Sequence, residues 1–166
     1  VISWSGLSIA PPAAFSDALE NDPDQKARSS YFMLFATPWL AETLFSADDF
    51  ARMKWMHSSM SQTQAEEYHA LLSEPGALTA TFNWYRAMMT GASAPPTTNL
   101  QVDVPTVFVW GNEDVAVGRY GVEQQAQYMD GPYKEIELDA GHWLFRDQPR
   151  QTVAAVLMHI QKFSEK

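Results

Sequence analysis

The sequence predicts an α/β fold, with a short parallel sheet of about three strands and a helical insertion after the first of them. Two patterns carry this prediction. Residues beyond 97 alternate between strand and helix patterns, at spacings that favour parallel pairing with right-handed crossovers. Residues from 20 to 90 show helical patterns without strands. We therefore expect a first strand within 1–19, a helical insertion over 20–96, and a βαβα arrangement over 97–166.

Composition and charge narrow the class of protein. The chain has 166 residues, enough for one domain with a core, and 46% of them are hydrophobic. A net charge of -9 without a cluster of Lys and Arg argues against a partnership with nucleic acid or an anionic membrane. The absence of cysteine from the sequence excludes disulfides, thiolate metal sites and thiol nucleophiles.

Targeting segments and cofactor motifs are not predicted either. No apolar run reaches the roughly 18 residues that a membrane span requires. Residues 1–10 lack the basic start and the long apolar centre of a signal peptide, so we expect a cytoplasmic protein. The sequence supports neither a metal site nor a phosphate-binding loop, and we expect no cofactor.

The first part of the chain predicts one strand and two helices. Residues 7–10 have a strand composition that ends at Pro11 and Pro12, and Pro12 suits the first position of a helix. The run 21–24 closes that helix and starts another. The following segment, 25–36, is apolar nearly all round, which predicts a helix buried on several sides.

Three further helices are expected before a linker. Ser46 and the acidic residues after it suit the start of a helix that carries Phe50, Met53 and Met56. Ser61 and Gln64 have the spacing of a capping box. A third helix follows Pro75, with one apolar face formed by Leu78, Phe82, Tyr85 and Met89. The small and Pro-rich run 91–99 is the predicted linker.

The remaining elements are two strands and two helices. The run 106–110 is apolar and bounded by Pro and Gly, as expected of a strand covered on both faces. A helix is expected over 119–129, a second strand over 133–138 and a last helix over 149–163. The last helix is expected to present one apolar side, formed by Val153, Val156, Leu157, Ile160 and Phe163.

Two side chains follow the ends of the predicted strands and form the candidate chemical centre. Asp114 lies in Gly111-Asn112-Glu113-Asp114, and His142 lies 28 residues later in Gly141-His142-Trp143. The carboxyl ends of parallel strands meet at one edge of a sheet, where ligands bind. A carboxylate hydrogen-bonded to one imidazole nitrogen fixes the tautomer and favours the charge gained when the other nitrogen takes a proton.

In this order and spacing, the two motifs resemble the α/β-hydrolase fold, and within it the epoxide hydrolase and haloalkane dehalogenase group. Residues 104–163 look like the last two strand and helix units of that fold, with Asp114 as the acid and His142 as the histidine of a triad. Residues 7–15 resemble the strand that leads into the helical cap, although Ala10-Pro11-Pro12 replaces the more frequent Pro-His-Pro. The resemblance implies that 20–96 is this cap.

The resemblance also assigns two tyrosines. In epoxide hydrolases similar to this sequence, two cap tyrosines hold and protonate the epoxide oxygen while an aspartate opens the ring. Asn83-Trp84-Tyr85-Arg86 matches the motif of one, and Tyr31 in Tyr31-Phe32-Met33-Leu34-Phe35 falls where the other is expected. Tyr85 also places a hydroxyl on an apolar helix face, where it needs a polar partner.

The nucleophile of such a triad is missing from the 166 residues. Neither Gly-x-Ser-x-Gly nor Gly-x-Asp-x-Gly occurs, and Gly6-Leu7-Ser8 is unsuitable because we expect no strand before it and no helix at the serine. We therefore expect this hydrolase-like chain to be inactive alone, with a small apolar substrate if a nucleophile half completes it. The alternative is a non-enzymatic interaction protein stabilised by homo-oligomerisation or by pairing with an N-terminal half.

Simpler roles compete with each assignment. Asp114 can be a turn or capping residue, His142 can be held by backbone groups, and both tyrosines can be ordinary core residues. Glu113 and Asp139 are expected to be solvated loop carboxylates. The remaining histidines lack a second ligand at helical spacing and are expected to serve surface or packing roles: His57, His69 and His159.

Overall fold

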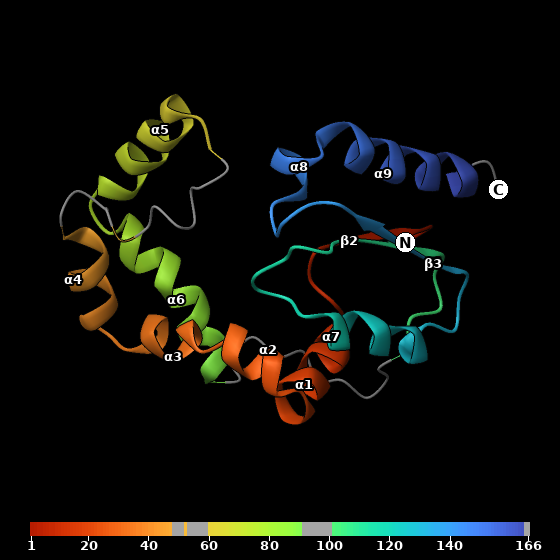
Figure 1. Cartoon of the computed structure of the whole chain (residues 1–166), viewed down its shortest axis with the longest axis horizontal. Helices are drawn as coiled ribbons and strands as arrows, with labels where there is room; N and C mark the ends of the chain where they lie inside the picture. Colours follow the sequence, from red (N-terminus) through yellow and green to blue (C-terminus); the bar gives the residue numbers. More distant parts are fainter. Residues whose placement is uncertain (48–51, 53–59, 91–100, 165–166) are drawn as a thin grey trace. The chain divides into compact units, whose positions relative to one another are not determined.

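The computed structural model describes residues 1–47, 52, 60–90 and 101–164. The chain forms two compact units. One contains residues 1–29 and 98–166, and the other contains residues 30–97. They are called the sheet unit and the helical unit below, and Figure 1 shows the elements of each.

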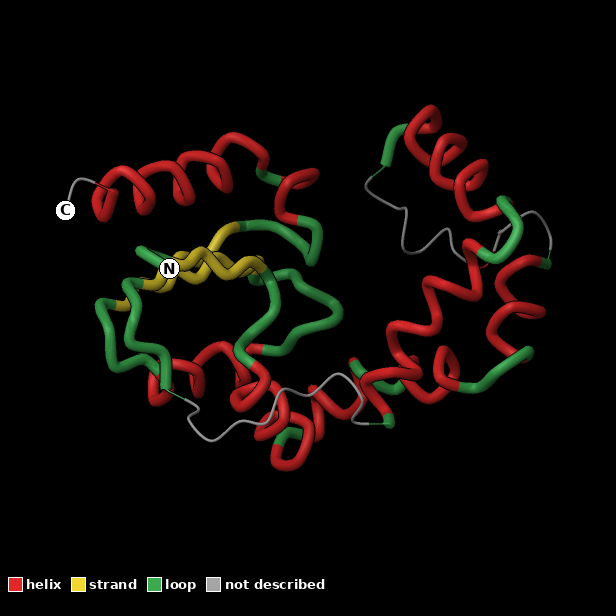
Figure 2. The backbone as a smooth tube through the Cα atoms, turned by 180° about the vertical axis from the view of Figure 1, so that it is seen from behind, coloured by secondary structure: helices red, strands yellow, loops and turns green. Residues whose placement is uncertain are grey.

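The sheet unit contains a three-stranded parallel sheet in the order β1-β2-β3. Its strands are β1 (Trp4–Leu7), β2 (Thr106–Gly111) and β3 (Tyr133–Leu138), and Leu7 pairs with Val109 while Gly111 pairs with Leu138. The central strand β2 is buried at all six positions, in agreement with its apolar sequence. The predicted short parallel sheet is therefore confirmed, and Figure 2 shows its strands in yellow.

Helices cover both faces of this sheet. Figure 1 shows α8 (Leu144–Asp147) and α9 (Pro149–Ser164) on one face, and α1 (Pro12–Asn21) and α7 (Arg119–Gln124) on the other. The first face buries Val107 and Val109, and the second buries Phe108 and Trp110, because successive strand residues point to opposite sides. The short α2 (Pro23–Arg28) follows α1, and a 3₁₀ turn, η2 (Gln125–Tyr128), follows α7.

Several predicted boundaries are wrong. The first strand lies at Trp4–Leu7 instead of 7–10, because Ser8 has a φ of 61° and turns the chain. The expected helix 25–36 is two helices, α2 and α3 (Tyr31–Ala36), separated at Ser29 and Ser30. The helix expected over 119–129 tightens after residue 124 into the 3₁₀ turn.

The apolar side expected for α9 is not the side that faces the sheet. The helix buries Thr152, Ala155 and His159 against the sheet. Small side chains at 152 and 155 let the helix backbone approach the strands closely, and Nε2–H of His159 donates to the carbonyl of Pro105 at 3.1 Å. The expected apolar side faces away from the sheet, and its residues Val153, Leu157 and Ile160 are 44%, 50% and 45% exposed.

The helical unit contains α3, α4 (Leu40–Ser46), α5 (Gln62–Ser73) and α6 (Ala77–Met89) among its described residues. Its core is formed by Phe35, Ala41, Phe45, Leu72, Leu78 and Phe82. The capping box is confirmed, since Ser61 and Gln64 make both reciprocal hydrogen bonds. Leu78, Phe82 and Tyr85 lie on the packed side of α6, whereas Met89 is 53% exposed.

Two predictions fall outside the described residues: the helix expected after Ser46 with Phe50, Met53 and Met56, and the linker 91–99. Among the described helices, none is long and apolar enough to cross a membrane.

Candidate active site

The acid turn follows β2 directly. Asp114 N–H donates to the carbonyl of Gly111 at 3.1 Å, so the chain folds back as soon as the strand ends. The Asp114 side chain is fully buried, and its Oδ1 accepts the N–H groups of Ala116 at 2.7 Å and Val117 at 2.9 Å. A carboxylate that accepts backbone donors in this way is held in one orientation.

The histidine loop passes very close to the end of β2. A side chain at Gly111 would collide with the carbonyl oxygens of Ala140 and Gly141, so only a glycine permits this approach. Glu113 N–H donates to the carbonyl of Ala140 at 3.0 Å, which ties the two loops together. Asp147 then accepts the N–H of Gly141 at 2.9 Å and fixes the loop from its other end.

These loops bring Asp114 and His142 into contact, as expected from the sequence. Nδ1 of His142 lies 2.9 Å from Oδ2 and 3.1 Å from Oδ1 of Asp114. Since a carboxylate accepts, Nδ1 carries the proton and Nε2 keeps its lone pair. The His142 side chain is 18% exposed, whereas the Asp114 side chain is 0% exposed. His142 can therefore act as a base whose orientation is fixed by the buried carboxylate of Asp114.

Ser8 contributes to this site in a way that the sequence did not reveal. Contrary to our expectation, a strand does precede it, because β1 ends at Leu7. Ile9 N–H donates to the carbonyl of Leu7 at 2.7 Å, which closes a three-residue γ-turn around Ser8, whose φ is 61°. The Ser8 hydroxyl donates to the backbone carbonyl of His142 at 2.7 Å, and this hydrogen bond holds the histidine loop in place.

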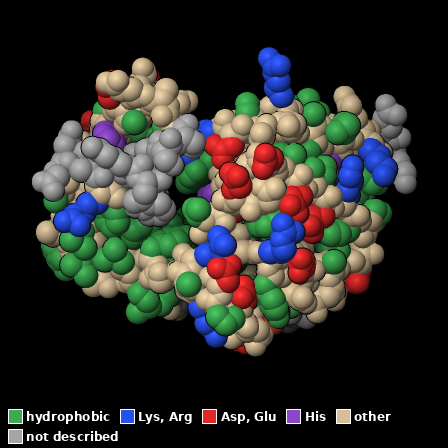
Figure 3. All heavy atoms as spheres, in the orientation of Figure 1, with side chains coloured by type: hydrophobic (Ala, Val, Ile, Leu, Met, Phe, Trp, Pro, Cys, Tyr) green, Lys and Arg blue, Asp and Glu red, His purple; other side chains and the backbone are tan. Residues whose placement is uncertain are grey.

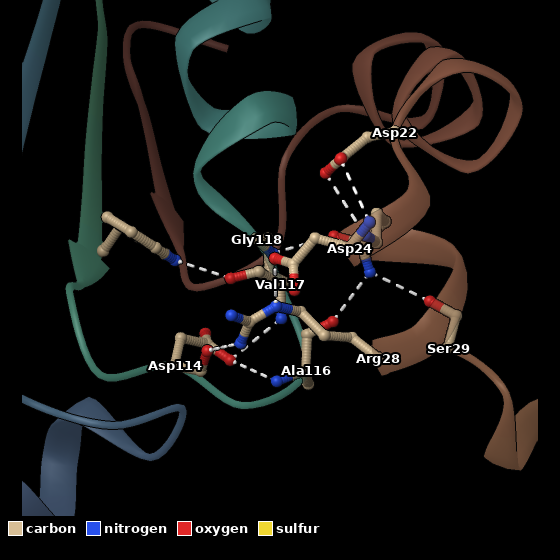
Figure 4. A network of polar contacts seen from close by, with 10 residues as sticks. Asp22, Asp24, Arg28, Ser29, Asp114, Ala116, Val117 and Gly118 are labelled. Atoms are coloured by element: carbon tan, nitrogen blue, oxygen red, sulfur yellow. Dashed lines mark hydrogen bonds and ion pairs between the residues drawn. The ribbon is translucent and has the colours of Figure 1, made fainter.

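Two residues of α2 also contact the acid turn, and sequence patterns did not single them out. Arg28 donates through Nη1 to the carbonyl of Asp114, as Figure 4 shows. Gln25 is 0% exposed and bonds to Ala116 and Gly118. The sequence could have pointed to Gln25 in one way. It is a polar residue in the segment 25–36, which is expected to be buried on several sides, and a buried amide side chain needs hydrogen-bond partners.

The two candidate tyrosines lie together in the helical unit. The rings of Tyr31 and Tyr85 are 5.9 Å apart in an edge-on arrangement, and both pack on Phe35. Burial raises the pKa of the Tyr85 phenol, while its hydrogen bond with Tyr31 acts in the opposite direction. Two adjacent phenols with one mutual hydrogen bond form a group that can donate to a ligand oxygen.

Three of the other ionisable groups considered from the sequence lie in the sheet unit outside this pair. Glu113 and Asp139 are exposed loop residues, and His159 packs on the sheet. His69 lies in α5, and His57 falls outside the described residues. Among the described residues, no group of His, Asp and Glu could hold a metal ion. Figure 3 shows carboxylates interspersed with Lys and Arg on the surface in that view.

Comparisons with known proteins agree with this geometry. The human protein Epoxide hydrolase 4 is 30% identical over 155 residues, and Epoxide hydrolase 3 of Xenopus tropicalis is 31% identical over 157 residues. These matches cover 86% and 87% of this chain, but only 42% of the length of each relative. No family model matches the chain.

Solved structures show the same fold. An epoxide hydrolase from Bacillus megaterium matches 97% of this chain with a TM-score of 0.82 at 15% identity, and 61% of that chain is covered. An epoxide hydrolase from a metagenome of a hot environment matches 96% of this chain with a TM-score of 0.78 at 21% identity, with 59% of it covered.

The parallel sheet and the paired loops at its carboxyl edge define an α/β-hydrolase fold protein. Within that fold the chain is similar to the C-terminal portion of epoxide hydrolases. The resemblance expected from the two motifs is confirmed.

Proposed function

We propose that this chain supplies the acid, the base and the oxygen-holding groups of an epoxide hydrolase-like reaction on a small apolar epoxide. The observation that carries the proposal is the buried Asp114 carboxylate, bonded to Nδ1 of His142. In the proposed step, Nε2 of His142 accepts a proton from a water molecule while the water oxygen attacks the carbonyl carbon of a covalent ester. Asp114 stabilises the imidazolium that results. The bond from that carbon to the diol oxygen then breaks, and the diol oxygen leaves with the proton held by His142.

Tyr31 and Tyr85 are proposed to hold the epoxide oxygen. Both phenols are half-buried in an aromatic cluster, so a hydrogen bond to a ligand oxygen would meet little competition from water. A tyrosine phenol is protonated at neutral pH even at its ordinary pKa of about 10, and burial raises the pKa of Tyr85 further, so its O–H is available to donate. When the ring opens, one phenol would give its proton to the leaving oxygen.

The proposal includes inactivity of the 166 residues by themselves, because no Gly-x-Ser-x-Gly or Gly-x-Asp-x-Gly motif provides the nucleophile. Purified chain incubated with styrene oxide should form no diol above the uncatalysed rate. Turnover that disappears in His142→Ala would contradict the proposed inactivity.

A joined protein tests the roles of the residues. We would fuse the chain to the preceding part of a related epoxide hydrolase that carries Gly-x-Asp-x-Gly, and assay diol formation. The His142→Ala change should lower turnover by about 10²- to 10⁴-fold, the usual contribution of a general base. The His69→Ala change in α5 serves as the matched control and should leave turnover unchanged. An active fusion that tolerates His142→Ala would refute the assignment.

A second candidate function, assembly with another chain, is favoured by exposed apolar surface on the sheet unit. Among the described residues, β1 has a neighbouring strand on one side only, and Ile2 and Ile9 beside it are 69% and 58% exposed. The outer side of α9 adds Val153, Leu157 and Ile160. We propose that a second copy, or a chain with the nucleophile half, covers this surface.

Light scattering over a range of concentrations tests this assembly. We expect a mass above that of one chain, and a lower mass for Leu157→Glu, which places a charge in the exposed apolar stripe. Gln151→Glu adds the same charge at an exposed position on another side of α9 and should keep the assembly. A stable monomer at all concentrations would rule out self-association.

A further inference from the structure

We propose that Gln25, assisted by Arg28, is a positioning residue for Asp114. This inference rests on the proposed function, because the Asp114–His142 pair is the group that it serves. Gln25 lies on α2, and its side chain bonds to residues that follow it by 91 and 93 positions in the sequence. The contact is therefore a product of the fold rather than of local sequence.

Every hydrogen-bonding group of the Gln25 side chain has a partner. The residue is 0% exposed. Its Nε2 donates to the carbonyl of Ala116 at 2.8 Å and to the hydroxyl of Ser29 at 2.9 Å, and its Oε1 accepts the N–H of Gly118 at 2.8 Å. Both amide protons and the amide oxygen are thus engaged, which fixes the orientation of the side chain.

One peptide group joins Gln25 to the carboxylate of Asp114. The carbonyl of Ala116 and the N–H of Val117 belong to the same planar unit. Gln25 donates to that carbonyl, and that N–H donates to Oδ1 of Asp114 at 2.9 Å. Because the unit is rigid, a shift at the glutamine moves the donor that holds the carboxylate. Hydrogen bonds in such a chain also strengthen one another.

Arg28 and the start of α2 support the same turn. Arg28 donates through Nη1 to the carbonyl of Asp114 and through Nε to Asp24 at 2.6 Å. Asp22 caps the helix by accepting the N–H groups of Asp24 and Gln25. Figure 4 shows this network from the capping carboxylate of Asp22 to the acid turn.

Gly118 completes the fit between α2 and the acid turn. A Cβ at this position would lie 3.1 Å from Oδ2 of Asp24 and 3.5 Å from Oε1 of Gln25. The backbone of the turn therefore approaches α2 at a point where a side chain would be crowded. The backbone of the acid turn is therefore in direct contact with Gln25, as a positioning role requires.

The test compares Gln25→Met with Ser29→Ala in the full chain labelled with ¹⁵N-histidine. The methionine keeps the volume of the side chain and removes its three hydrogen bonds. Ser29→Ala removes one buried partner of the same glutamine and leaves its two bonds to the acid turn. The readout is the exchange rate with water of the Nδ1–H proton of His142, assigned by its loss in His142→Ala.

We expect Gln25→Met to speed this exchange by about tenfold, the effect of losing hydrogen bonds of ordinary net strength. Ser29→Ala should leave it unchanged. A folded Gln25→Met protein with the wild-type exchange rate would overturn the inference, as would an equal acceleration in Ser29→Ala, since general loosening would then explain both.

Two further measurements keep the inference testable if Gln25→Met does not fold. In the wild-type chain, the Gly118 amide and the ring proton of His142 should be slowed by the same factor relative to their intrinsic exchange rates, since one opening event releases both. A Gly118 amide that is slowed by a much smaller factor would contradict the positioning role. Arg28→Met, at a side chain that is 32% exposed, should also speed ring-proton exchange, and an unchanged rate would remove Arg28 from the proposal.

The same readout separates this inference from the proposed function. A wild-type chain without a slowly exchanging Nδ1–H proton on His142 would show that the Asp114–His142 pair itself does not form. A protected proton that is insensitive to Gln25→Met would reject the positioning role alone.

Discussion

The two units hold their candidate functional residues in different ways. In the sheet unit, Asp114 is held by directed hydrogen bonds from Ala116, Val117 and His142. In the helical unit, Tyr31 and Tyr85 rest on an aromatic cluster around Phe35, whose contacts are broad and less directional. Hydrogen bonds fix the angle of a group, whereas packing fixes its place. We therefore expect the acid–histidine pair to be sensitive to geometry and the tyrosines to core stability.

The largest expected effect is the loss of Phe35. Its ring is 2% exposed and contacts Phe45 and Phe82 as well as both tyrosines. Phe35→Ala should destabilise the helical unit by about 3–5 kcal/mol, because it leaves a cavity in the core. Urea unfolding followed by amide signals of α3 and α6 measures this change.

An exposed aromatic residue of the same unit provides the control. Trp84 on α6 is 73% exposed, and Trp84→Ala should change stability by no more than about 0.5 kcal/mol. If the contrast between the two units is correct, Phe35→Ala also keeps the slowly exchanging ring proton of His142. Loss of that proton together with the helical unit would show that packing controls both sites.

The next effect in size is expected at Gly111. An alanine here forces the Ala140 and Gly141 carbonyls away, which should cost about 1–3 kcal/mol and separate His142 from Asp114. The measurement combines thermal unfolding with the ring-proton signal of His142. Gly76→Ala is the control, since φ is +82° there and no atom lies within 4 Å of the added Cβ. It should lower stability and leave the His142 signal intact.

A smaller change in stability, about 1 kcal/mol, is expected for Asp114→Asn. The amide keeps an oxygen for the N–H groups of Ala116 and Val117, but its NH₂ group then faces the ring. His142 should therefore switch the proton from Nδ1 to Nε2. The ¹⁵N shifts of the two ring nitrogens report this switch directly. An unchanged tautomer would show that Asp114 does not determine the state of the histidine.

Sequence patterns predicted the parts of the fold whose signals are local. The apolar run of β2 and its bounding Pro105 and Gly111 gave the central strand, and the two motifs gave Asp114 and His142. The inner face of α9 could not be predicted in this way, because it consists of Thr152, Ala155 and His159, whereas the larger apolar side chains lie on another side of the helix.

The residues that hold the candidate site in place could not be predicted from local sequence patterns either. Gln25 meets the acid turn across more than 90 positions, and Ser8 meets His142 across 134 positions. Such contacts follow from how the strands and loops converge, and neither residue carries a motif of its own. Local sequence therefore identified the candidate acid–histidine pair and missed the residues that hold it.

The smallest expected effect concerns Tyr85 and the pH dependence of the helical unit. Burial raises the pKa of Tyr85 above its usual value of about 10, so the folded unit holds the phenol proton more tightly than the unfolded chain does. This contribution is fully present below pH of about 10 and is lost as the pH rises through the folded pKa. Tyr85→Phe should therefore flatten the fall in stability at alkaline pH, measured by urea unfolding. Tyr31→Phe should act in the opposite sense, because its hydroxyl lowers the pKa of Tyr85. A Tyr31→Phe profile identical to that of the wild type would mean that the phenols do not interact.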